Sequence, residues 1–389
     1  MLHFLLITGK QILQKVLNYK QRKREGKHNC LPLKFARARR KFPGFERGKY
    51  YLFSANQKVG KSKLVDDLFL HYPDEMRQQG QPIVTKVLYF SFEESEEDKA
   101  FQTSCYSLYK KKKLRMSPND EKSLDRELPD SVIEKLADNQ VADMTTRINS
   151  NVEYIDDIKN PTGIYKKVKT WLETLGHYNT VKGMTQDECG NWVEGNVIDK
   201  SNPFTFDDPE MYAIVIIDNF ANLNTERGWD LRQTIEKMSK YCIELAKFGI
   251  VMVAVQHQAQ STESLENLKY SQVVPTINGL GDAKTTARDA HATLGLFSPY
   301  RFQIRTHLNY DVTAFKDYLR FLYVIADRNG AVGTVIPLLF RGDVSTFEEL
   351  PKSDQVQALD AIKRQLEVEE LEIEQTFVVE KEQDNNSLF

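Results

Sequence analysis

The chain has 389 residues, of which 41% are hydrophobic and 11% aromatic, and its formal net charge at pH 7 is −2. These values indicate a soluble globular protein that can bury the core of one large α/β domain, or of one domain with a small appendage. The four cysteines are scattered, without a Cys-x-x-Cys pair and with few histidines nearby. This spacing argues against a disulfide framework and a zinc site, and it fits a reducing cytoplasm.

The two ends of the chain carry opposite charge. Residues 1–50 contain 14 Lys and Arg against two acidic residues, whereas residues 351–389 contain ten acidic residues against four basic ones. We therefore expect a basic N-terminal arm over residues 1–42 and an acidic helix and tail over residues 346–389. The Glu-rich end of this tail is predicted to be solvated and partly disordered.

The N-terminal apolar run "MLHFLLITG" is not followed by a small-residue cleavage site. It is also much shorter than the roughly 20 residues that a membrane span needs. We therefore expect neither a signal peptide nor a membrane anchor. Instead, the pattern from about Leu5 to Tyr19 predicts an amphipathic helix whose apolar face packs on another surface.

Apolar, β-branched runs recur along the chain with helical stretches between them. Because continuous apolar strands are buried on both faces, the runs predict a mostly parallel sheet covered by helices. Asn329-Gly330, after the last run, is a strong hairpin signal that leads into an antiparallel strand. The runs are "YYLFSA" (50–55), "VLYFSF" (87–92), "AIVIIDN" (213–219), "GIVMVAVQ" (249–256), "ATLGLFS" (292–298) and "FLYVIAD" (321–327).

The segment between the second and third runs, about residues 99–211, is too long for a single crossover connection. We interpret it as an insertion into a central domain that spans residues 43–345. Its first part, "SPNDEKSLDRELPDSVIEKLADN", predicts short charged helices, and "QDECGNWVEGNVIDKSNPF" predicts a polar hairpin or loop.

A phosphate-binding loop is predicted directly after the first run, where the sequence fits [Ala/Gly]-x4-Gly-Lys-[Ser/Thr]. In such a loop backbone N–H groups surround the β-phosphate, the glycine allows close approach, the lysine reaches the β- and γ-oxygens, and the hydroxyl ligates Mg²⁺. A helical apolar pattern follows, as the strand, loop and helix unit requires. This context favours a nucleotide site over an ordinary Gly-containing turn. The loop consists of Ala55, Asn56, Gln57, Lys58, Val59, Gly60, Lys61 and Ser62.

Carboxylates follow two other runs. Asp218 ends "AIVIID", and the ends of parallel strands are where ligands gather, so Asp218 is predicted to serve Mg²⁺ together with Ser62. Glu93 comes directly after "VLYFSF" and could polarise the water that attacks a phosphate. The alternative for Asp218 is a turn residue or helix cap, and for Glu93 a solvated acidic helix start.

In this order the motifs resemble the ATPase domain of DnaB-like replicative helicases, which are RecA-like ring motors. "VLYFSFEES" is similar to the segment that carries the family's catalytic glutamate, at Glu93, and "IVIIDNF" resembles the strand that ends in Asp218. "VMVAVQHQ" resembles the strand that ends in a γ-phosphate sensor, either Gln256 or His257. "VIADRNGAVGTV" resembles the hairpin whose arginine, here Arg328, reaches the ATP of the neighbouring subunit.

The resemblance covers about residues 43–342 apart from the insertion. It implies a RecA-like P-loop NTPase core with a mostly parallel central sheet and C-terminal antiparallel hairpin strands. It further implies an ATP-dependent helicase: a homo-oligomeric ring, expected to be a hexamer, that hydrolyses ATP with Mg²⁺ at subunit interfaces and moves along single-stranded DNA. An arginine that acts only on a neighbour's nucleotide would couple hydrolysis to ring assembly.

Two features depart from the family pattern. A lysine usually stands two residues before the finger arginine, and here that position is Ala326. The 42 residues before the ATPase domain have no room for the collar domain that meets primase in bacterial members. They would suffice for a linker helix that docks on a neighbouring subunit. A collarless chain of this kind resembles a phage-encoded helicase, which would work in the cytoplasm of a bacterial host.

Basic residues near the predicted central channel are candidates for contact with DNA phosphates. They are Lys269, Lys284 and Arg288, in the polar stretch after the sensor strand, and "KFARARRKF" (34–42) is a candidate DNA or subunit-interface strip. Solvated surface residues are the alternative for both. The terminal "NNSLF" loosely resembles a peptide that binds sliding clamps, although Asn385 stands where glutamine is expected. Primase and a loader are the other partners that the resemblance implies.

Other functions of the same core stay open on the sequence alone. One is a different DNA-dependent ATPase, either a recombinase-like filament former or a packaging motor. Another is a nucleotide-bound scaffold without motor activity, for which Ala326 is the only indication.

Overall fold

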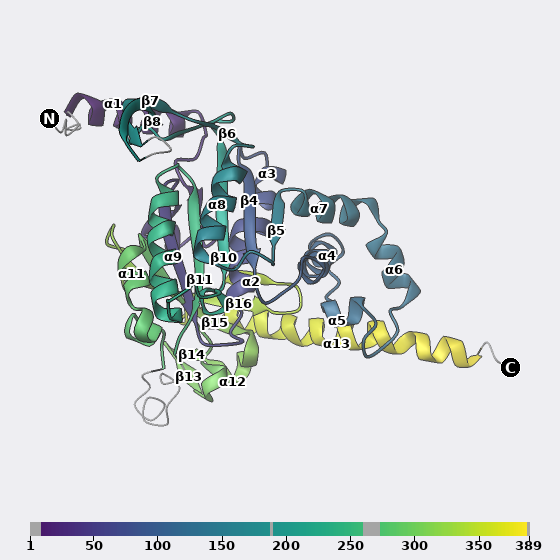
Figure 1. Cartoon of the computed structure of the whole chain (residues 1–389). Coiled ribbons are helices and arrows are strands. Elements are labelled where there is room, and N and C mark those ends of the chain that lie inside the picture. Colours follow the sequence, from purple (N-terminus) through teal and green to yellow (C-terminus); the bar gives the residue numbers. More distant parts are fainter. Residues whose placement is uncertain (1–8, 187–189, 260–272, 387–389) are drawn as a thin grey trace.

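The computed structural model describes residues 9–186, 190–259 and 273–386. Its central feature is a nine-stranded sheet in the order β17-β16-β15-β12-β3-β11-β10-β4-β5. Figure 1 shows this sheet at the centre of the molecule, with helices around it. Strands β12, β3, β11, β10, β4 and β5 are parallel, and β15, β16 and β17 add an antiparallel end. The strands are β3 (Lys49–Ala55), β4 (Val84–Ser91), β5 (Val152–Ile155), β10 (Met211–Asp218), β11 (Val251–His257), β12 (Ala292–Phe297), β15 (Leu319–Asp327), β16 (Val335–Arg341) and β17 (Thr346–Glu349).

The predicted mostly parallel sheet is therefore confirmed, and so is the hairpin at Asn329-Gly330, where β15 turns into β16. Strand β10 illustrates why these runs are continuously apolar. Ile214 and Ile216 belong to the core on one face of the sheet, and Val215 and Ile217 belong to the core on the other face. Because side chains alternate along a strand, a strand covered on both faces needs apolar residues at every position.

Helices cover both faces. On one face lie α2 (Lys61–Asp66), a π-helical turn η2 (Asp67–His71), α3 (Tyr72–Gln78), α4 (Glu96–Lys112) and α7 (Asn139–Asn149), with the short helices α5 (Pro118–Glu121) and α6 (Asp130–Leu136) beside them. The other face is covered by α8 (Pro161–Leu172), α9 (Leu231–Ala246) and α11 (Thr285–Asp289). Short turns of 3-10 helix occur at η1 (Ala38–Arg40), η3 (Phe220–Asn222), η5 (Asn278–Ala283), η6 (Tyr300–Phe302) and η7 (Lys316–Tyr318).

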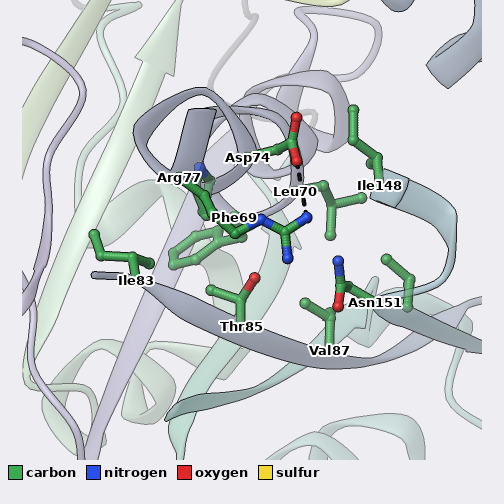
Figure 2. A pocket seen from close by; sticks show the side chains of 11 residues that line it. Phe69, Leu70, Asp74, Arg77, Ile83, Thr85, Val87, Ile148 and Asn151 are labelled. Carbon is green, nitrogen blue, oxygen red and sulfur yellow. Dashed lines mark hydrogen bonds and ion pairs between the residues drawn. The ribbon is translucent and has the colours of Figure 1, made fainter. Parts of the chain in front are cut away.

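Helix α7 packs against the helices that follow the phosphate loop. Ile148 of α7 lines a small pocket with Phe69 and Leu70 of η2, over the start of β4 (Figure 2). Asp74 of α3 accepts hydrogen bonds from Arg147 of α7, at 2.6 Å from Nε and 2.9 Å from Nη2. These contacts anchor the segment after β4 on the sheet.

The segment 99–211 is not wholly an insertion outside the sheet, which corrects the sequence interpretation. Strand β5 pairs in parallel with β4 and forms the sheet edge, so α4 to α7 make up its crossover connection. With only four residues, none of them fully buried, β5 has no apolar run that would reveal it. The predicted polar hairpin is present as β7 (Thr180–Gln186) and β8 (Trp192–Ile198), beside the short pair β6 (Gly176–Tyr178) and β9 (Phe204–Phe206).

The two terminal arms are both helical. Helix α1 (Gly9–Arg24) leaves Ile12, Leu13 and Val16 each more than half exposed, and its end is held by Arg22, whose Nη1 and Nη2 each lie 2.8 Å from an oxygen of Glu210. Helix α13 (Val356–Asn386) includes the Glu-rich end of the tail that the sequence predicted to be partly disordered (Figure 1). No helix within the described ranges is long and apolar enough to cross a membrane.

The remaining elements are short. Strands β1 (Leu31–Pro32) and β2 (Gly44–Phe45) pair ahead of the sheet, and β13 (Thr306–His307) and β14 (Tyr310–Asp311) form a small hairpin next to α12 (Val312–Phe315). Helix α13 packs on this part through the buried Leu359 and Leu366.

Candidate nucleotide site

The predicted phosphate loop joins β3 to α2, so the expected order of strand, loop and helix is present. Gly60 has φ 101°, in the left-handed region, and a Cβ added there would lie 2.9 Å from Cζ of Phe340. Only glycine fits both the backbone conformation and the space at this position. Asn56 is buried and Lys58 also has a positive φ, of 57°. Residues 55–62 therefore form a tight loop at the carboxyl end of a buried strand.

Lys61 lies inside this loop. The residue is 6% exposed, and Nζ lies 2.9 Å both from the backbone oxygen of Asn56 and from Nδ1 of His257. Burial lowers the pKa of Lys61 to about 8, although Asp218 and Glu93 act in the opposite direction. The ammonium is thus placed, partly desolvated, where a phosphate oxygen would provide a stronger partner.

Asp218 ends β10 next to the phosphate loop. The carboxylate is buried, and this burial raises its pKa, while Lys99 and the hydroxyl of Ser62 act to lower it. Its Oδ1 atom is buried and has no hydrogen-bond partner of normal geometry in the part of the chain that is described. A buried carboxylate oxygen with an open coordination position, beside a serine hydroxyl, fits the hard oxygen ligands that Mg²⁺ prefers. Ser62 and Asp218 are the residues that could hold the ion.

Glu93 lies on the loop after β4 and is 44% exposed. One of its oxygens accepts a hydrogen bond from Asn219 Nδ2 and lies 3.4 Å from Nε2 of His257. The hydrogen bond with His257 is the main cause that lowers the pKa of Glu93 below its ordinary value, against a smaller effect of burial. Glu93 is therefore ionised at neutral pH and open to water, as a water-orienting base must be.

The structure separates the two candidates at the end of β11. His257 lies between Lys61 and Glu93. Gln256 is buried and turned away, because its Oε1 accepts a hydrogen bond from Thr286 at 2.7 Å and its Nε2 donates to the backbone oxygen of Leu280 at 3.4 Å. Adjacent strand residues point to opposite faces, so only one of the two can meet the loop.

Sequence reasoning missed two polar residues of this site. Asn219 follows Asp218, donates to Glu93, and is fixed by its own Oδ1, which accepts from the backbone N–H of Ala221 at 2.8 Å. Arg301, in the turn η6 after β12, donates to the backbone oxygen of Gln57 in the phosphate loop. The only signal for either was its place at the carboxyl end of a parallel strand, where ligands gather.

Arg328 lies far from the loop of its own chain. Strand register pairs Asp327 with Ala292 and Ala292 with Tyr51, whereas the phosphate loop begins at Ala55. Four strand residues, or roughly 13 Å at 3.3 Å per residue, separate the two levels of the sheet. The guanidinium of Arg328 donates to the backbone oxygens of Arg288 and Asp289, at 2.9 and 3.2 Å.

The candidate DNA contacts are placed only in part. Lys284, just before α11, and Arg288, within α11, are both exposed. Lys269 lies outside the described residues. In the basic strip 34–42, several cations bond within the chain: Lys34 to Asp67 at 2.6 Å, Arg37 to Glu349 at 3.0 Å and Arg39 to Tyr72 at 2.6 Å. The exposed cations of this strip are Arg37, Arg40 and Lys41.

Comparison with known proteins gives a clear result for the fold. No protein-family model and no curated protein sequence matches the chain. One solved structure, described as an ATPase domain, matches with a TM-score of 0.62 at 15% identity, over 88% of this chain and 100% of that one. A second, described as a DnaB-like replicative helicase with its interactions with primase, matches with a TM-score of 0.60 at 15% identity, over 87% of this chain and 66% of that one. The fold is that of a DnaB-like helicase ATPase domain.

The two matches confirm the predicted RecA-like α/β fold, with its mostly parallel sheet and antiparallel hairpin strands. In this DnaB-like fold the phosphate loop, Glu93, Asp218 and His257 converge at one edge of the sheet. The site therefore lies where parallel strands end, as ligand sites in such sheets do.

Proposed function

We propose that this chain is the motor subunit of an ATP-dependent replicative DNA helicase. One observation carries the proposal: His257, at the end of β11, lies 2.9 Å from Lys61 of the phosphate loop and 3.4 Å from Glu93 at the end of β4. A phosphate-binding cation, an ionised carboxylate and a polar group that touches both are what hydrolysis of a γ-phosphate needs in one place. The DnaB-like fold supports the assignment.

In the proposed reaction Lys61 and the loop N–H groups bind the phosphates. Glu93 orients the attacking water and accepts its proton, while Asn219 and His257 hold the carboxylate. Ser62 and Asp218 would hold Mg²⁺, which neutralises phosphate charge. Arg301 adds a cation beside the loop from η6. These groups are gathered from the ends of several different strands.

Completion of the site requires a neighbouring subunit. Arg328 lies at the opposite level of the sheet from its own phosphate loop, and we infer that it acts on the ATP of the next subunit in a ring, expected to be a hexamer. The apolar side of α1, with Ile12, Leu13 and Val16 exposed, would dock on a neighbour. Lys269, Lys284 and Arg288 would contact single-stranded DNA in the channel. Ala326 leaves this interface one positive charge short of the family pattern.

The test is ATP hydrolysis by the purified protein, with and without single-stranded DNA. We expect stimulation by DNA in the wild type, loss of activity in Arg328→Ala and in Lys61→Ala, and partial recovery when the two variants are mixed one to one. Recovery occurs because a mixed interface can pair an intact Arg328 with an intact Lys61. Turnover that ignores both DNA and Arg328 would contradict the helicase assignment.

Assembly is tested separately by negative-stain imaging with an ATP analogue and DNA. Closed rings support the proposal, whereas helical filaments would favour a recombinase-like protein. We place the protein in the cytoplasm of a phage-infected bacterial cell, in keeping with its resemblance to phage-encoded helicases.

A further inference from the structure

Behind the nucleotide site lies a buried lysine that the proposed reaction does not use. Lys99, in the first turns of α4, is 2% exposed, and its Nζ lies 2.8 Å from Asp66 Oδ2 and 2.7 Å from Glu94 Oε2. Asp66 belongs to the helix that follows the phosphate loop, and Glu94 is the residue after Glu93. A single ammonium therefore connects the phosphate-loop helix to the loop that carries Glu93.

A buried ion pair such as Lys99 with Asp66 contributes little to the free energy of unfolding. The cost of burying an ammonium and a carboxylate is comparable to the attraction between them, so apolar residues of the same size would often serve as well. Burial lowers the pKa of Lys99, but Asp66, Glu94 and Asp218 together raise it above its ordinary value, so the side chain is charged. A charged buried lysine specifies the positions of its partners.

Lys99 also reaches the magnesium-side carboxylate through one intermediate. Its Nζ lies 3.5 Å from the hydroxyl oxygen of Tyr89, which is fully buried and donates to Asp218 Oδ2 at 3.1 Å. An ammonium can only donate. The Tyr89 oxygen therefore accepts from Lys99, and its hydrogen is directed to Asp218.

The consequence falls on the other oxygen of Asp218. With Oδ2 held by Tyr89, the carboxylate cannot rotate freely, and Oδ1 stays free of hydrogen bonds of normal geometry among the described residues. Glu94 is fixed in turn, because its second oxygen accepts from Gln102 of α4 at 2.7 Å. The network thus holds Asp218 in one orientation from a rigid helix.

We propose that Lys99 is a positioning residue that, through Tyr89, orients Asp218 for Mg²⁺. The inference rests on the proposed function, since it assigns Mg²⁺ to Ser62 and Asp218. It predicts that Lys99 controls how much Mg²⁺ strengthens nucleotide binding. Binding measured without Mg²⁺ does not depend on it.

The experiment titrates the full-length protein with a fluorescent ADP analogue in EDTA and in Mg²⁺. The wild type should bind more tightly with Mg²⁺. In Lys99→Met and in Tyr89→Phe this gain should fall about tenfold, the effect of losing one hydrogen bond to a charged group, with affinity in EDTA unchanged. Tyr89→Phe removes only a hydroxyl, so it tests the series of contacts from Lys99 through Tyr89 to Asp218 even if Lys99→Met does not fold.

Two further variants separate positioning from stability. Lys112→Met removes an ion pair with Asp138 from the other end of α4 and should leave the Mg²⁺ gain intact. Lys99→Met combined with Tyr89→Phe should lose no more than either alone, because both interrupt one chain of contacts. Lys99→Arg should recover part of the gain.

The outcomes distinguish the two levels of inference. A wild type whose nucleotide affinity is indifferent to Mg²⁺ would contradict the proposed function itself. The role of Lys99 would be overturned if the wild type gains affinity from Mg²⁺ and Tyr89→Phe keeps that gain. It would also be overturned if Lys112→Met loses as much of the gain as Lys99→Met does. In both cases the proposed function would still stand.

Discussion

Nδ1 of His257 lies 2.9 Å from Nζ of Lys61, although 196 residues separate them in sequence. The contact exists because β11 and β3 are neighbours in the sheet, with His257 paired to Ala55 at the entrance of the phosphate loop. His257 is thus in contact with both the phosphate loop and Glu93.

Substitution of His257 should affect the reaction more than the fold. We expect His257→Ala to slow ATP hydrolysis by roughly 10²-fold or more, the scale of an acid–base or orienting group, with little change in thermal stability. Gln256→Ala is the matched comparison, because it removes buried hydrogen bonds and should lower the free energy of unfolding by about 1–3 kcal/mol. Steady-state kinetics and denaturant unfolding would check both; the reverse pattern would assign the sensor position to Gln256.

Glu93→Gln should separate binding from hydrolysis. The amide keeps the shape of the side chain but cannot accept a proton, so turnover should fall by roughly 10²–10⁴-fold while nucleotide affinity is retained. Glu97→Gln, in the exposed first turn of α4, is the control and should behave as the wild type. Normal multiple turnover in Glu93→Gln would show that another group activates the water.

Nucleotide affinity should depend on pH through Lys61. The pKa of this lysine is about 8 in the free protein, and binding of phosphate must raise it, because the charged form is the one that binds. Affinity should therefore be flat below pH 8 and fall above it, by at most about tenfold per pH unit. Equilibrium titration of a fluorescent ADP between about pH 7 and 9.5 would measure this.

The control for this pH dependence is Lys61→Arg, whose guanidinium stays charged throughout the range. The affinity of Lys61→Arg for the fluorescent ADP should not change with pH, whether it is higher or lower than that of the wild type. An equal decline in Lys61→Arg would assign the titration to another group.

The exposed apolar side of α1 should be needed for assembly. Leu13→Asp combined with Leu17→Asp places charge where both side chains are about half exposed in the single chain, and where docking would bury them. Sedimentation should show dissociated subunits with unchanged circular dichroism. Gln11→Asp with Asn18→Asp adds the same charge on the same helix and should still assemble; loss of assembly in this control would point to general repulsion.

The parallel core and the phosphate loop could be predicted from the order of the amino acids alone. Strands such as β10 are buried along their whole length, so their apolar runs are visible without the structure. Gly60-Lys61-Ser62 is also a local signal, because the three residues lie within one tight turn. The positions of Glu93 and Asp218 followed from the rule that ligands gather at the carboxyl ends of parallel strands.

Features that depend on side-chain direction and on non-local pairing needed the three-dimensional arrangement. The choice between Gln256 and His257 depends on which face of β11 points toward the phosphate loop. A shift of one residue in the alignment places the other side chain on that face. Strand β5 is short and half-buried at an edge, so its pairing with β4 leaves no pattern in the sequence. Lys99 and Asp66 meet across two helices, and nothing local distinguishes them from the exposed charges around them.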